Sequence, residues 1–478
     1  MKQITAIAAA EWHYWARSKL ALTVALVALL LIVLAALTSA ERTNTLAHER
    51  NSLQSDALEI FQAQPDRHPH RMVHYGHYAF KPPPPLSVVD PGVDAYSGNV
   101  IFLEGHRQNT AMFAERENGA VPNLLGSLSP AFVLQVLAPI CLILIGYGAL
   151  TREREGQTAL QLFSQGVSPA QLLAGKFLAL FSVALLMLIP LAAAALSAMH
   201  HGEAVSIVTS LITGYGAYLT VWILFVIFAS AVSRNSAASL MLLLGAWTLV
   251  ALILPSYATN SGRLATESTG KIESDFALLA ELRTLGDGHN SADPAFASFR
   301  AKLLETHGVE RVEDLPINFR GAVATKAEAD LTAVLRRYAE QRFESESRQA
   351  AAAGVYGWLS PVIAMRELSM AIAGTDLLSH HRFLREAEAL RFDFVQGLNA
   401  VHTNQLSYQD DMNRSNDPEA ERRTRANAEN WQVLEDYRFG AATSKARLAN
   451  GAGGASILLV WLLLGGLLCW TVGRRRIL

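Results

Sequence analysis

The segment TREREGQTALQLFSQGVSPAQLLAGK, residues 151–176, is a short polar stretch between two long apolar ones. Four charged residues follow one another near its start: Arg152, Glu153, Arg154 and Glu155. Gly156 ends this charged run, and Gly166 marks a second turn. The flanking runs, residues 129–150 and 177–199, contain no Lys, Arg, Asp, Glu or His. Since about 20 apolar helical residues cross a bilayer core, the segment is expected to join two membrane-spanning helices.

The rest of the chain follows the same pattern. Hydrophobic residues make up 51% of the sequence and charged residues 17%, whereas soluble domains have about 25% charged residues. The net charge of −2 provides no basic excess, so nucleic acid is not an expected partner. Six stretches are apolar and long enough to span a bilayer: residues 20–40, 129–150, 177–199, 205–231, 237–257 and 455–472. We therefore predict an α-helical integral membrane protein with six transmembrane helices, surrounded by membrane lipid.

The short loops predict the orientation, because Lys and Arg favour the cytoplasmic side of a membrane. If the N-terminus lies inside, the short inner segments contain Lys2, Arg17, Lys19, Arg152, Arg154, Lys176, Arg234, Arg474, Arg475 and Arg476. The short outer loop, residues 200–204, contains neither residue type. We therefore predict cytoplasmic N- and C-termini, with residues 473–478 as a cytoplasmic tail. The first span is expected to remain as an anchor, because signal peptides have shorter apolar parts, of about 7–15 residues.

Residues 1–19 precede the first span. Trp12, Tyr14 and Trp15 lie among charged residues there, and such rings favour the headgroup level of a bilayer. We predict a helix that lies on the cytoplasmic membrane surface, with an ordinary polar lead-in to the first span as the alternative.

Two long regions, residues 41–128 and 258–454, lie outside the predicted spans. We expect them to form a large, mainly helical extracytoplasmic domain built from two insertions. In the first insertion a helical pattern near residues 46–64 is followed by an extended polyproline segment at Pro82–Pro85. Residues 100–103 have the composition of a short strand.

Local signals predict where helices begin and end in the second insertion. Gly374 is expected to end one helix, and Thr375 or Asp376 to cap another that runs towards residue 405. Asp417 lies directly before a proline and is a further start signal.

The segment VYGWLSPVIAMRELSMAIA, residues 355–373, resembles a seventh span at first sight. It contains Pro361 and the charged pair Arg366 and Glu367, and a charge near the bilayer centre costs several kcal/mol. A seventh span would also place the basic C-terminal tail outside. We therefore predict a buried or interfacial helix outside the membrane.

The polar segment at residues 151–176 resembles the cytoplasmic coupling loop of type-2 (exporter-class) ABC transporter permeases. In that family a pattern like E-x-E-x-G-T-x-x-x-L precedes a Ser/Gly-Pro turn and a Gly-Lys pair at the next span. The matching residues are Glu153, Glu155, Gly156, Thr158, Ser168, Pro169, Gly175 and Lys176. Gln157 takes a place where the family usually has glycine. The segments around residues 80–100 and 359–391 resemble a subgroup with a large C-terminal extracytoplasmic domain of unknown function.

The resemblance implies a permease subunit of an ATP-driven ABC transporter in a bacterial inner (plasma) membrane. It implies a separate ABC ATPase subunit as partner, and a second copy of the chain or a paralogous permease. The coupling surface would comprise Arg152, Glu153, Arg154, Glu155, Gly156, Thr158, Ser168, Pro169 and Lys176. The extracytoplasmic domain would cover the exit of the pathway and bind substrate or pass it to an extracytoplasmic partner protein. A merely solvated loop with charges beside a span is the alternative.

The chain is not expected to bind ATP or any other cofactor. A phosphate-binding loop needs G-x-x-x-x-G-K-[ST], but Phe177 follows Lys176, and Ala170 replaces the first glycine. ATP and Mg²⁺ are therefore expected on the partner ATPase. The spans contain few polar residues, a pattern that weakly favours an amphipathic or lipid-like substrate: Gln135, Tyr147, Tyr215 and Thr220.

Two other classes of protein remain as hypotheses. One is a membrane-anchored interaction or sensing protein whose outer domain recruits partners. The other is a membrane-embedded enzyme, although the sequence contains neither the H-E-x-x-H nor the G-x-S-x-G motif. Cys141 and Cys469 both lie in apolar runs, so no disulfide framework is expected.

One stretch of the first insertion is rich in histidine, a frequent ligand of zinc, copper and nickel: His68, His70, His74 and His77. Pro69 and Gly76 argue against one continuous helix, and no nearby residue completes a ligand set. These histidines are therefore expected to face solvent, with a metal site as the less favoured alternative.

Two histidine pairs lie elsewhere in the chain. His200 and His201, together with Glu203, are expected to form a polar cap on an outer turn, with a ligand gate as the alternative. His380 and His381 are expected on the surface of a helix.

Overall fold

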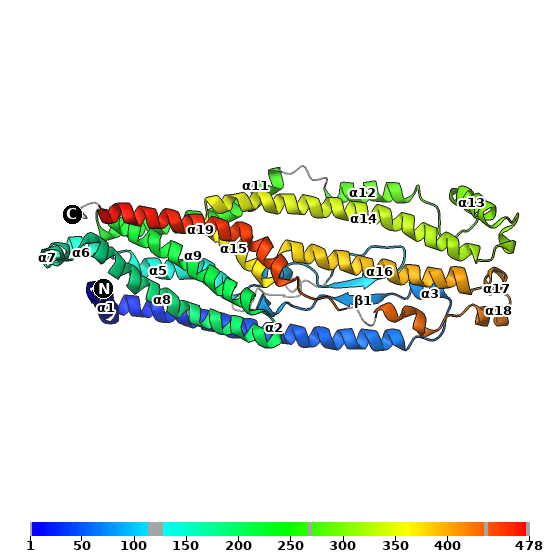
Figure 1. The fold of residues 1–478 in the computed structure, drawn as a ribbon, viewed down its shortest axis with the longest axis horizontal. Coiled ribbons are helices and arrows are strands. Elements are labelled where there is room, and N and C mark those ends of the chain that lie inside the picture. The colour runs from blue at the N-terminus through cyan, green and yellow to red at the C-terminus, as the bar shows by residue number, and fades with distance from the viewer. Residues whose placement is uncertain (1, 113–127, 266–269, 435–437, 475–478) are drawn as a thin grey trace.

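The computed structural model describes residues 2–112, 128–265, 270–434 and 438–474. The molecule is a long helical rod with both termini of the described chain at one end (Figure 1). We call this end the basal end. The distal region is the described part of residues 41–128, 258–354 and 374–443. Residues 475–478 of the predicted tail lie outside the described residues.

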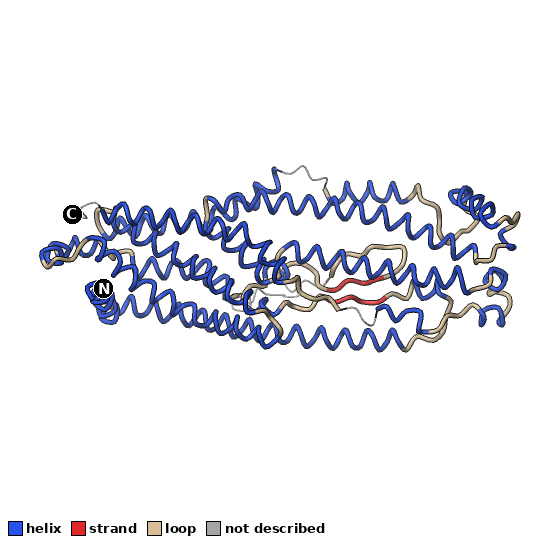
Figure 2. Tube along the Cα trace, viewed as in Figure 1, coloured by secondary structure: helices blue, strands red, loops and turns tan. Residues whose placement is uncertain are grey.

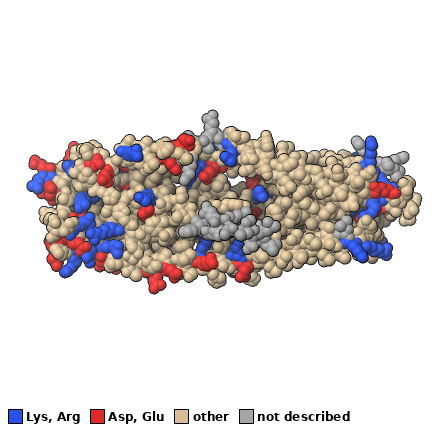
Figure 3. Space-filling model, turned by 180° about the vertical axis from the view of Figure 1, so that it is seen from behind, with Lys and Arg blue, Asp and Glu red and all other residues tan. Residues whose placement is uncertain are grey.

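Six helical stretches of the described chain are apolar and long enough to cross a membrane: Ala21–Gln62, Pro130–Glu155, Pro169–His201, Val205–Val232, Ser236–Leu264 and Ser444–Arg474. Each overlaps one predicted span, so the predicted six-span helical fold is confirmed. Figure 3 shows a band almost free of charged side chains between the charged basal end and the charged distal region. This uncharged band lies where the six apolar helical stretches run.

The first span belongs to a helix of 44 residues, α2 (Lys19–Gln62), which follows α1 (Lys2–Arg17) after the cap residue Ser18. At 1.5 Å per residue it is about 66 Å long and continues from the basal end into the distal region. The sequence predicted two helices here. They form one because no Gly or Pro interrupts residues 41–62.

The second and fifth spans each contain a π-helical turn that ends two residues before a proline. The elements are α4 (Pro130–Phe132), η3 (Val133–Leu137), α5 (Ala138–Gly146), α10 (Ser236–Trp247), η5 (Thr248–Ile253) and α11 (Leu254–Ala265). Pro139 and Pro255 lack the N–H of a regular helical turn, and their rings displace the preceding carbonyl groups. The remaining spans are α8 (Pro169–Ser197) with η4 (Ala198–His201), α9 (Val205–Val232) and α19 (Ser444–Arg474).

The first insertion contains the strands drawn in Figure 2. β1 (His77–Phe80) and β2 (Val100–Leu103) pair antiparallel, with Tyr78 opposite Phe102. The predicted strand at residues 100–103 is confirmed, whereas its partner was not predicted. Pro84 has the polyproline angles φ −59° and ψ 147°. The other elements of this insertion are α3 (Pro69–Val73), η1 (Pro85–Val88) and η2 (Gly92–Ala95).

The second insertion is built on two long helices that lie side by side, α14 (Phe319–Gly354) and α16 (Leu377–Gln405) (Figure 1). Gly374, with φ +75°, ends the helix before α16, and the Asp376 side chain accepts from the Ser379 N–H. Asp417 caps the next predicted helix. These predicted ends are confirmed. The smaller elements are α12 (Lys271–Leu282), η6 (Pro294–Phe296), α13 (Ala297–His307), η7 (Val312–Asp314), α17 (Tyr408–Asn413), α18 (Pro418–Arg423) and η9 (Ala428–Leu434).

One apolar core joins the two insertions in the distal region. Phe61 of α2 and Ile101 of β2 share it with Phe394 of α16 and with Trp431, and all four side chains are buried. The rings of Phe61 and Phe394 are 5.8 Å apart between centroids. Burial of these aromatic side chains makes the two insertions a single packed body.

Residues 355–373 form η8 (Val355–Trp358) and α15 (Pro361–Ala373), a helix that packs against α9 and α19. The prediction of a buried helix is confirmed, but this helix lies beside the spans. Ser360 Oγ donates to the Val250 carbonyl (2.7 Å), and the Trp461 indole N–H to that of Gly357 (3.1 Å). Of the charged pair that opposed membrane placement, Arg366 is exposed and Glu367 is half-buried.

Close packing between α15 and α19 depends on a glycine. A Cβ atom at Gly454 would lie 2.5 Å from the Ala364 carbonyl oxygen, whereas a Cβ atom at Gly466, on the same helix, would meet no atom within 4 Å. We expect Gly454→Ala to lower the thermal stability of the detergent-solubilised chain, because overpacking costs about 1–3 kcal/mol. Gly466→Ala should leave stability unchanged or slightly raised, since alanine is the better helix former by about 0.5–1 kcal/mol.

Thermal unfolding of the two variants, followed by intrinsic fluorescence, tests this prediction. Equal melting temperatures for the two variants would contradict the packing of α15 against α19.

Candidate functional site

The polar segment between the second and third spans folds into two short helices at the basal end, α6 (Thr151–Glu155) and α7 (Thr158–Ser164) (Figure 1). Gly156 ends α6, and Gln157 adopts the left-handed region with φ +60°. Glycine favours that conformation, and the permeases that this segment resembles usually have glycine at this position. Ser168 and Gln171 form a capping box around Pro169 at the start of α8.

Three charged residues of the predicted coupling set are anchored against α1 and α8. Arg152 contacts both carboxylate oxygens of Glu11, at 2.7 and 2.9 Å, and its guanidinium lies 3.7 Å from the Tyr14 ring centroid. Lys176 pairs with Glu11 and with Glu153. Glu11 is 4% exposed and Lys176 is 2% exposed. Buried charges require such partners, so α1, α6 and α8 are held together at this point.

The next two charges complete the ends of two other spans. Arg154 donates to the carbonyl oxygens of Ser230 (2.9 Å) and Ser233 (2.5 Å), at the end of α9. Glu155 accepts from the Ser236 N–H (2.7 Å) and hydroxyl (2.6 Å), at the start of α10. A cation at a helix C-terminus and an anion at an N-terminus both complement the helix dipole. The α6 segment is therefore attached to four neighbouring helices.

The surface that remains free belongs to α7 and its flanking turns. Gln157, Leu160, Gln161 and Ser164 are exposed, and Leu160 retains 50% of its accessible surface. Gly156, Thr158 and Ser168 of the predicted set are exposed too, and Pro169 is half-buried. The charged residues thus anchor the segment, while the uncharged face of α7 is presented outwards. Sequence reasoning missed Glu11, although a carboxylate in the apolar stretch of α1 signals a buried partner.

A second polar assembly is buried where the spans meet α15. Gln135 donates to the Tyr215 hydroxyl (3.0 Å), which lies 2.9 Å from Ser369 Oγ. Ser369 in turn donates to Asp90 of the first insertion (2.5 Å). Burial raises the pKa of Asp90 despite this hydrogen bond and another from the Gly92 N–H. The chain of contacts links the second span, the fourth span, α15 and the distal region, and the sequence indicated only its two members in the spans.

The turn between the third and fourth spans is closed by a buried ion pair. Arg447, at the start of α19, donates to both oxygens of Glu203 at 2.8 and 2.9 Å and also to the Ile372 carbonyl. His200 and His201 are exposed beside it. Glu203 thus acts as a structural partner at this turn, in agreement with the predicted polar cap.

The histidines of the first insertion divide into three environments, and they do not all face solvent. His68 is buried, with Nε2 3.2 Å from Asp411, and its Nδ1 accepts from the His70 N–H. Burial lowers the pKa of His68 to about 4. His77 is buried 4.9 Å from the Phe61 ring centroid, and burial lowers its pKa to about 4 as well.

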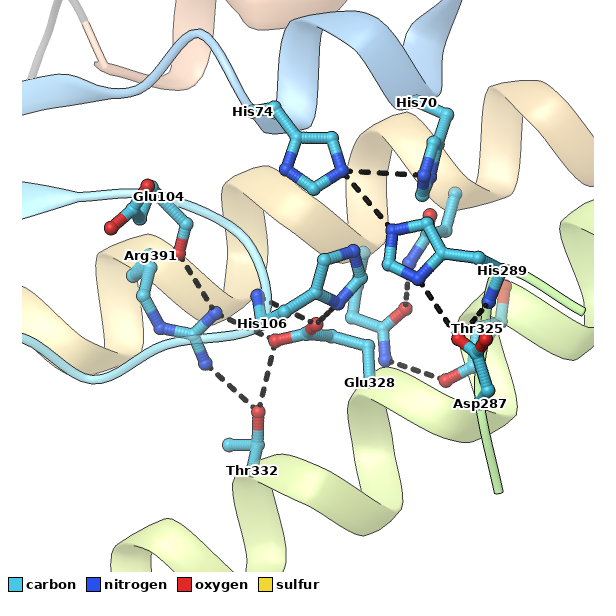
Figure 4. A network of polar contacts seen from close by, with 12 residues as sticks. His70, His74, Glu104, His106, Asp287, His289, Thr325, Glu328, Thr332 and Arg391 are labelled. Carbon is cyan, nitrogen blue, oxygen red and sulfur yellow. Dashed lines mark hydrogen bonds and ion pairs between the residues drawn. The ribbon is translucent and has the colours of Figure 1, made fainter. Parts of the chain in front are cut away.

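His70 and His74 form the third environment, together with His106 and His289 (Figure 4). Burial, followed by repulsion from the neighbouring rings, lowers the pKa of His70 to about 2, so the ring is uncharged at neutral pH. Sequence reasoning did not connect His106 or His289 with this group, because neither lies near the histidine-rich stretch.

The predicted surface position of His381 was wrong. The side chain is fully buried, its Nε2 lies 2.6 Å from Glu346, and its ring stacks on Phe343 at 4.4 Å. Both partners belong to α14, so the packing of α14 against α16 covers this face of the helix. The sequence of α16 alone contains no sign of that contact.

The anchor of α6 makes a prediction about stability. Lys176→Met leaves Glu11 and Glu153 without their buried cation, and breaking a buried pair costs about 3–5 kcal/mol. We expect a clear fall in the thermal stability of the solubilised chain, whereas Lys445→Met, at an exposed lysine, should have no effect.

A double variant separates this ion pair from a general packing defect. If the pair is the cause, Glu11→Gln combined with Lys176→Met should lose less stability than the sum of the two single losses. Strictly additive losses would show that the two residues do not interact.

Comparison with known protein families matches residues 5–299 to the ABC-2 family transporter protein. Residues 271–440 match a second family, described as a domain of unknown function (DUF3526). None of the curated proteins compared with the chain matches it. The first match covers more than half of the 478 residues, including the α6–α7 segment and five of the six candidate spans in the described chain. The chain therefore belongs to the ABC-2 family of transporter proteins.

Proposed function

We propose that this ABC transporter permease moves its substrate with energy from ATP hydrolysed on a separate ATPase subunit, and that the subunit docks on α7. The proposal rests on one observation about the α6–α7 segment, whose charged and uncharged residues have different surroundings. Its charges are bound to four helices, and its uncharged face is exposed at the basal end. ATP and Mg²⁺ belong to the partner, since the chain contains no phosphate-binding loop.

The contacts of α6 provide a mechanical path for coupling. A displacement of α7 acts on α1 through the Arg152–Glu11 pair and on α8 through the Glu153–Lys176 pair. It acts on α9 and α10 through Arg154 and Glu155. Because these polar contacts are short and the Glu153–Lys176 pair is largely buried, the segment moves with these helices as a unit. Helices α8 and α9 extend to the outer turn, where Glu203 binds Arg447. Motion at the basal end can thereby reach the distal region.

The orientation and the assembly are parts of the same proposal. The basal end is placed in the cytoplasm and the distal region outside, in a bacterial inner membrane, in keeping with the Lys and Arg residues of the short basal segments. In the most apolar window of the span Ser236–Leu264, only 17% of residues are buried within one chain. A second permease copy, or a paralogous permease, and lipid would cover this exposed surface.

The distal region is proposed to stand over the exit of the pathway. It is joined to the spans by α2, which is uninterrupted, and by the buried contacts of Asp90 with Ser369. A domain attached in this way can follow movements of the spans and receive substrate or an extracytoplasmic partner protein. The few polar side chains of the spans favour an amphipathic or lipid-like substrate.

The docking face can be tested without disturbing the fold. We expect Leu160→Asp, on the exposed face of α7, to abolish co-purification of an ATPase from native membranes in mild detergent. The reason is that an introduced carboxylate would be desolvated in the interface without a partner. Bound proteins are identified by mass spectrometry.

Met412→Asp is the matched control, because Met412 is 52% exposed and lies in α17 at the distal tip. Both variants should melt at the wild-type temperature, and the control should keep its ATPase. Retention of the ATPase by Leu160→Asp would contradict docking on the exposed face of α7. If wild type brings down no ATPase but other proteins bound to the distal region, the recruiting or sensing role replaces coupled transport.

The proposed assembly also makes a prediction about stoichiometry. We expect the mass of the purified native complex to correspond to two permease chains and two ATPase subunits. A complex with one permease chain and no paralogue would contradict pairing.

A further inference from the structure

Four histidines from three separate segments meet in the distal region (Figure 4). His70 and His74 lie on α3 and at its C-terminal cap, and His106 lies in the loop after β2. His289 comes from the second insertion, in the loop between α12 and η6. The ring centroids of all pairs of these four are 4.9 to 5.6 Å apart. The four rings therefore surround one point.

The nitrogen positions have the spacing of a tetrahedral metal centre. His74 Nε2 lies 3.3 Å from His70 Nε2 and 3.4 Å from His289 Nε2. One nitrogen from each of the four rings lies within 4.8 Å of the others. Zinc binds imidazole nitrogen at about 2.0–2.1 Å, which in a tetrahedron places neighbouring nitrogens about 3.3–3.4 Å apart. The closest separations in the cluster agree with this value.

Two carboxylates behind the rings direct the free nitrogens inwards. His106 Nδ1 lies 2.9 Å from Glu328 Oε2, and His289 Nδ1 lies 3.0 Å from Asp287 Oδ1. A carboxylate accepts the Nδ1–H proton, so the Nε2 atom of the same ring keeps its lone pair. This carboxylate–histidine arrangement is the one that orients metal-binding histidines. His106 Nε2 is buried, and among the described residues it has no hydrogen-bond partner.

The backbone at His106 is held in an unusual conformation. Its φ of +63° lies in the left-handed region, which side chains other than glycine rarely adopt. Glu328 maintains it, since its Oε2 also accepts from the His106 N–H at 3.3 Å. Glu328 is itself fully buried and is bound by Arg391 at 2.6 Å. Strained residues that are fixed so firmly are concentrated at functional sites.

We propose that His70, His74, His106 and His289 bind one divalent transition-metal ion, with Zn²⁺ as the best fit. Imidazole ligands suit zinc, copper and nickel, whereas Ca²⁺ and Mg²⁺ require oxygen ligands, which this ligand set lacks. The tetrahedral spacing favours Zn²⁺ over Cu²⁺, which prefers a square-planar arrangement. His74 and His289 are exposed, so an ion can reach the centre from solvent. The carboxylates of Glu328 and Asp287 offset its charge.

The other histidine group, His68 with His402 and Asp411, carries no such inference. The Asp411 carboxylate already lies within 2.8 Å of His402 Nε2, 3.3 Å of Asn318 and 3.4 Å of Arg414. His68 Nδ1 accepts from the His70 N–H, and its Nε2 lies 3.2 Å from Asp411 Oδ1. With the Asp411 oxygens engaged and the cations of Arg414 and Arg320 beside it, this group is a structural network.

The proposed ion would link the two insertions to each other. Three ligands come from the first insertion, and His289 is the single ligand from the second. Between α12 and η6, the loop of His289 is mostly exposed, so the ion would fix it against α3 and the end of β2. Metal binding would then stabilise the distal region and hold α12 in place. This inference does not depend on the proposed docking of an ATPase.

The test uses the full-length chain in detergent, purified without a histidine tag, stripped with a chelator and dialysed. Zinc binding is measured by calorimetry, and bound metal by mass spectrometry of the elements. We expect one Zn²⁺ per chain and a higher melting temperature with zinc than without. Cobalt should give the intense visible absorption of a tetrahedral centre rather than the weak bands of an octahedral one.

Three variants complete the experiment. The double variant His74→Ala with His289→Ala should abolish zinc binding and the zinc-dependent rise in melting temperature. Its melting temperature without metal should equal that of wild type, because both side chains are exposed. His200→Ala with His201→Ala, an exposed pair elsewhere, should bind like wild type. Asp287→Asn should weaken binding by about 10–100-fold, as expected for the loss of an orienting carboxylate.

Two results would overturn the proposal. One is wild-type binding that does not saturate at one ion per chain. The other is undiminished binding by His74→Ala with His289→Ala. In either case the four rings form a hydrogen-bonded cluster without a metal.

Discussion

Lipid hydrocarbon offers no hydrogen-bond partner, so polar groups that the chain buries between its spans must be satisfied by the chain itself. At the basal end this constraint brings Glu11 and Lys176 together and directs Arg154 to the last carbonyl groups of α9. Nearer the distal region it joins Gln135 and Tyr215 to α15. The contacts that make the spans tolerable in a membrane are therefore also the contacts that tie them to one another. The helices of this permease cannot be shifted singly without exposing a charge or an unpaired polar group.

That coupling is what a transporter driven by another polypeptide requires. A free, mobile loop at the basal end could bind an ATPase subunit but would transmit little of its motion. The α6 segment is instead held by short polar contacts to α1, α8, α9 and α10, and the uncharged face of α7 is exposed. At the other end α2 continues as one helix into the distal region. The two ends of the rod are therefore connected by helices and buried polar contacts throughout.

Features set by a few neighbouring residues could be predicted well. The ends of helices at Gly374, Asp376 and Asp417 follow from capping chemistry within one turn. The charges of residues 152–155 were recognised too, but their inward direction was not, because Glu11 lies 141 residues before Arg152. His381 was assigned to the surface, since nothing in its own helix indicates that Phe343 and Glu346 cover it.

Hydropathy along the chain was sufficient for the six spans and the helical class, because crossing a bilayer depends on the composition of about 20 consecutive residues. It was also sufficient for the two insertions, which are what remains between the spans. Which polar groups meet was decided only by the tertiary structure. His74 and His289 are 215 residues apart, and the Glu203–Arg447 pair joins residues 244 apart. Such partners are brought together by packing between distant segments, and the sequence around each residue does not indicate which partner it will have.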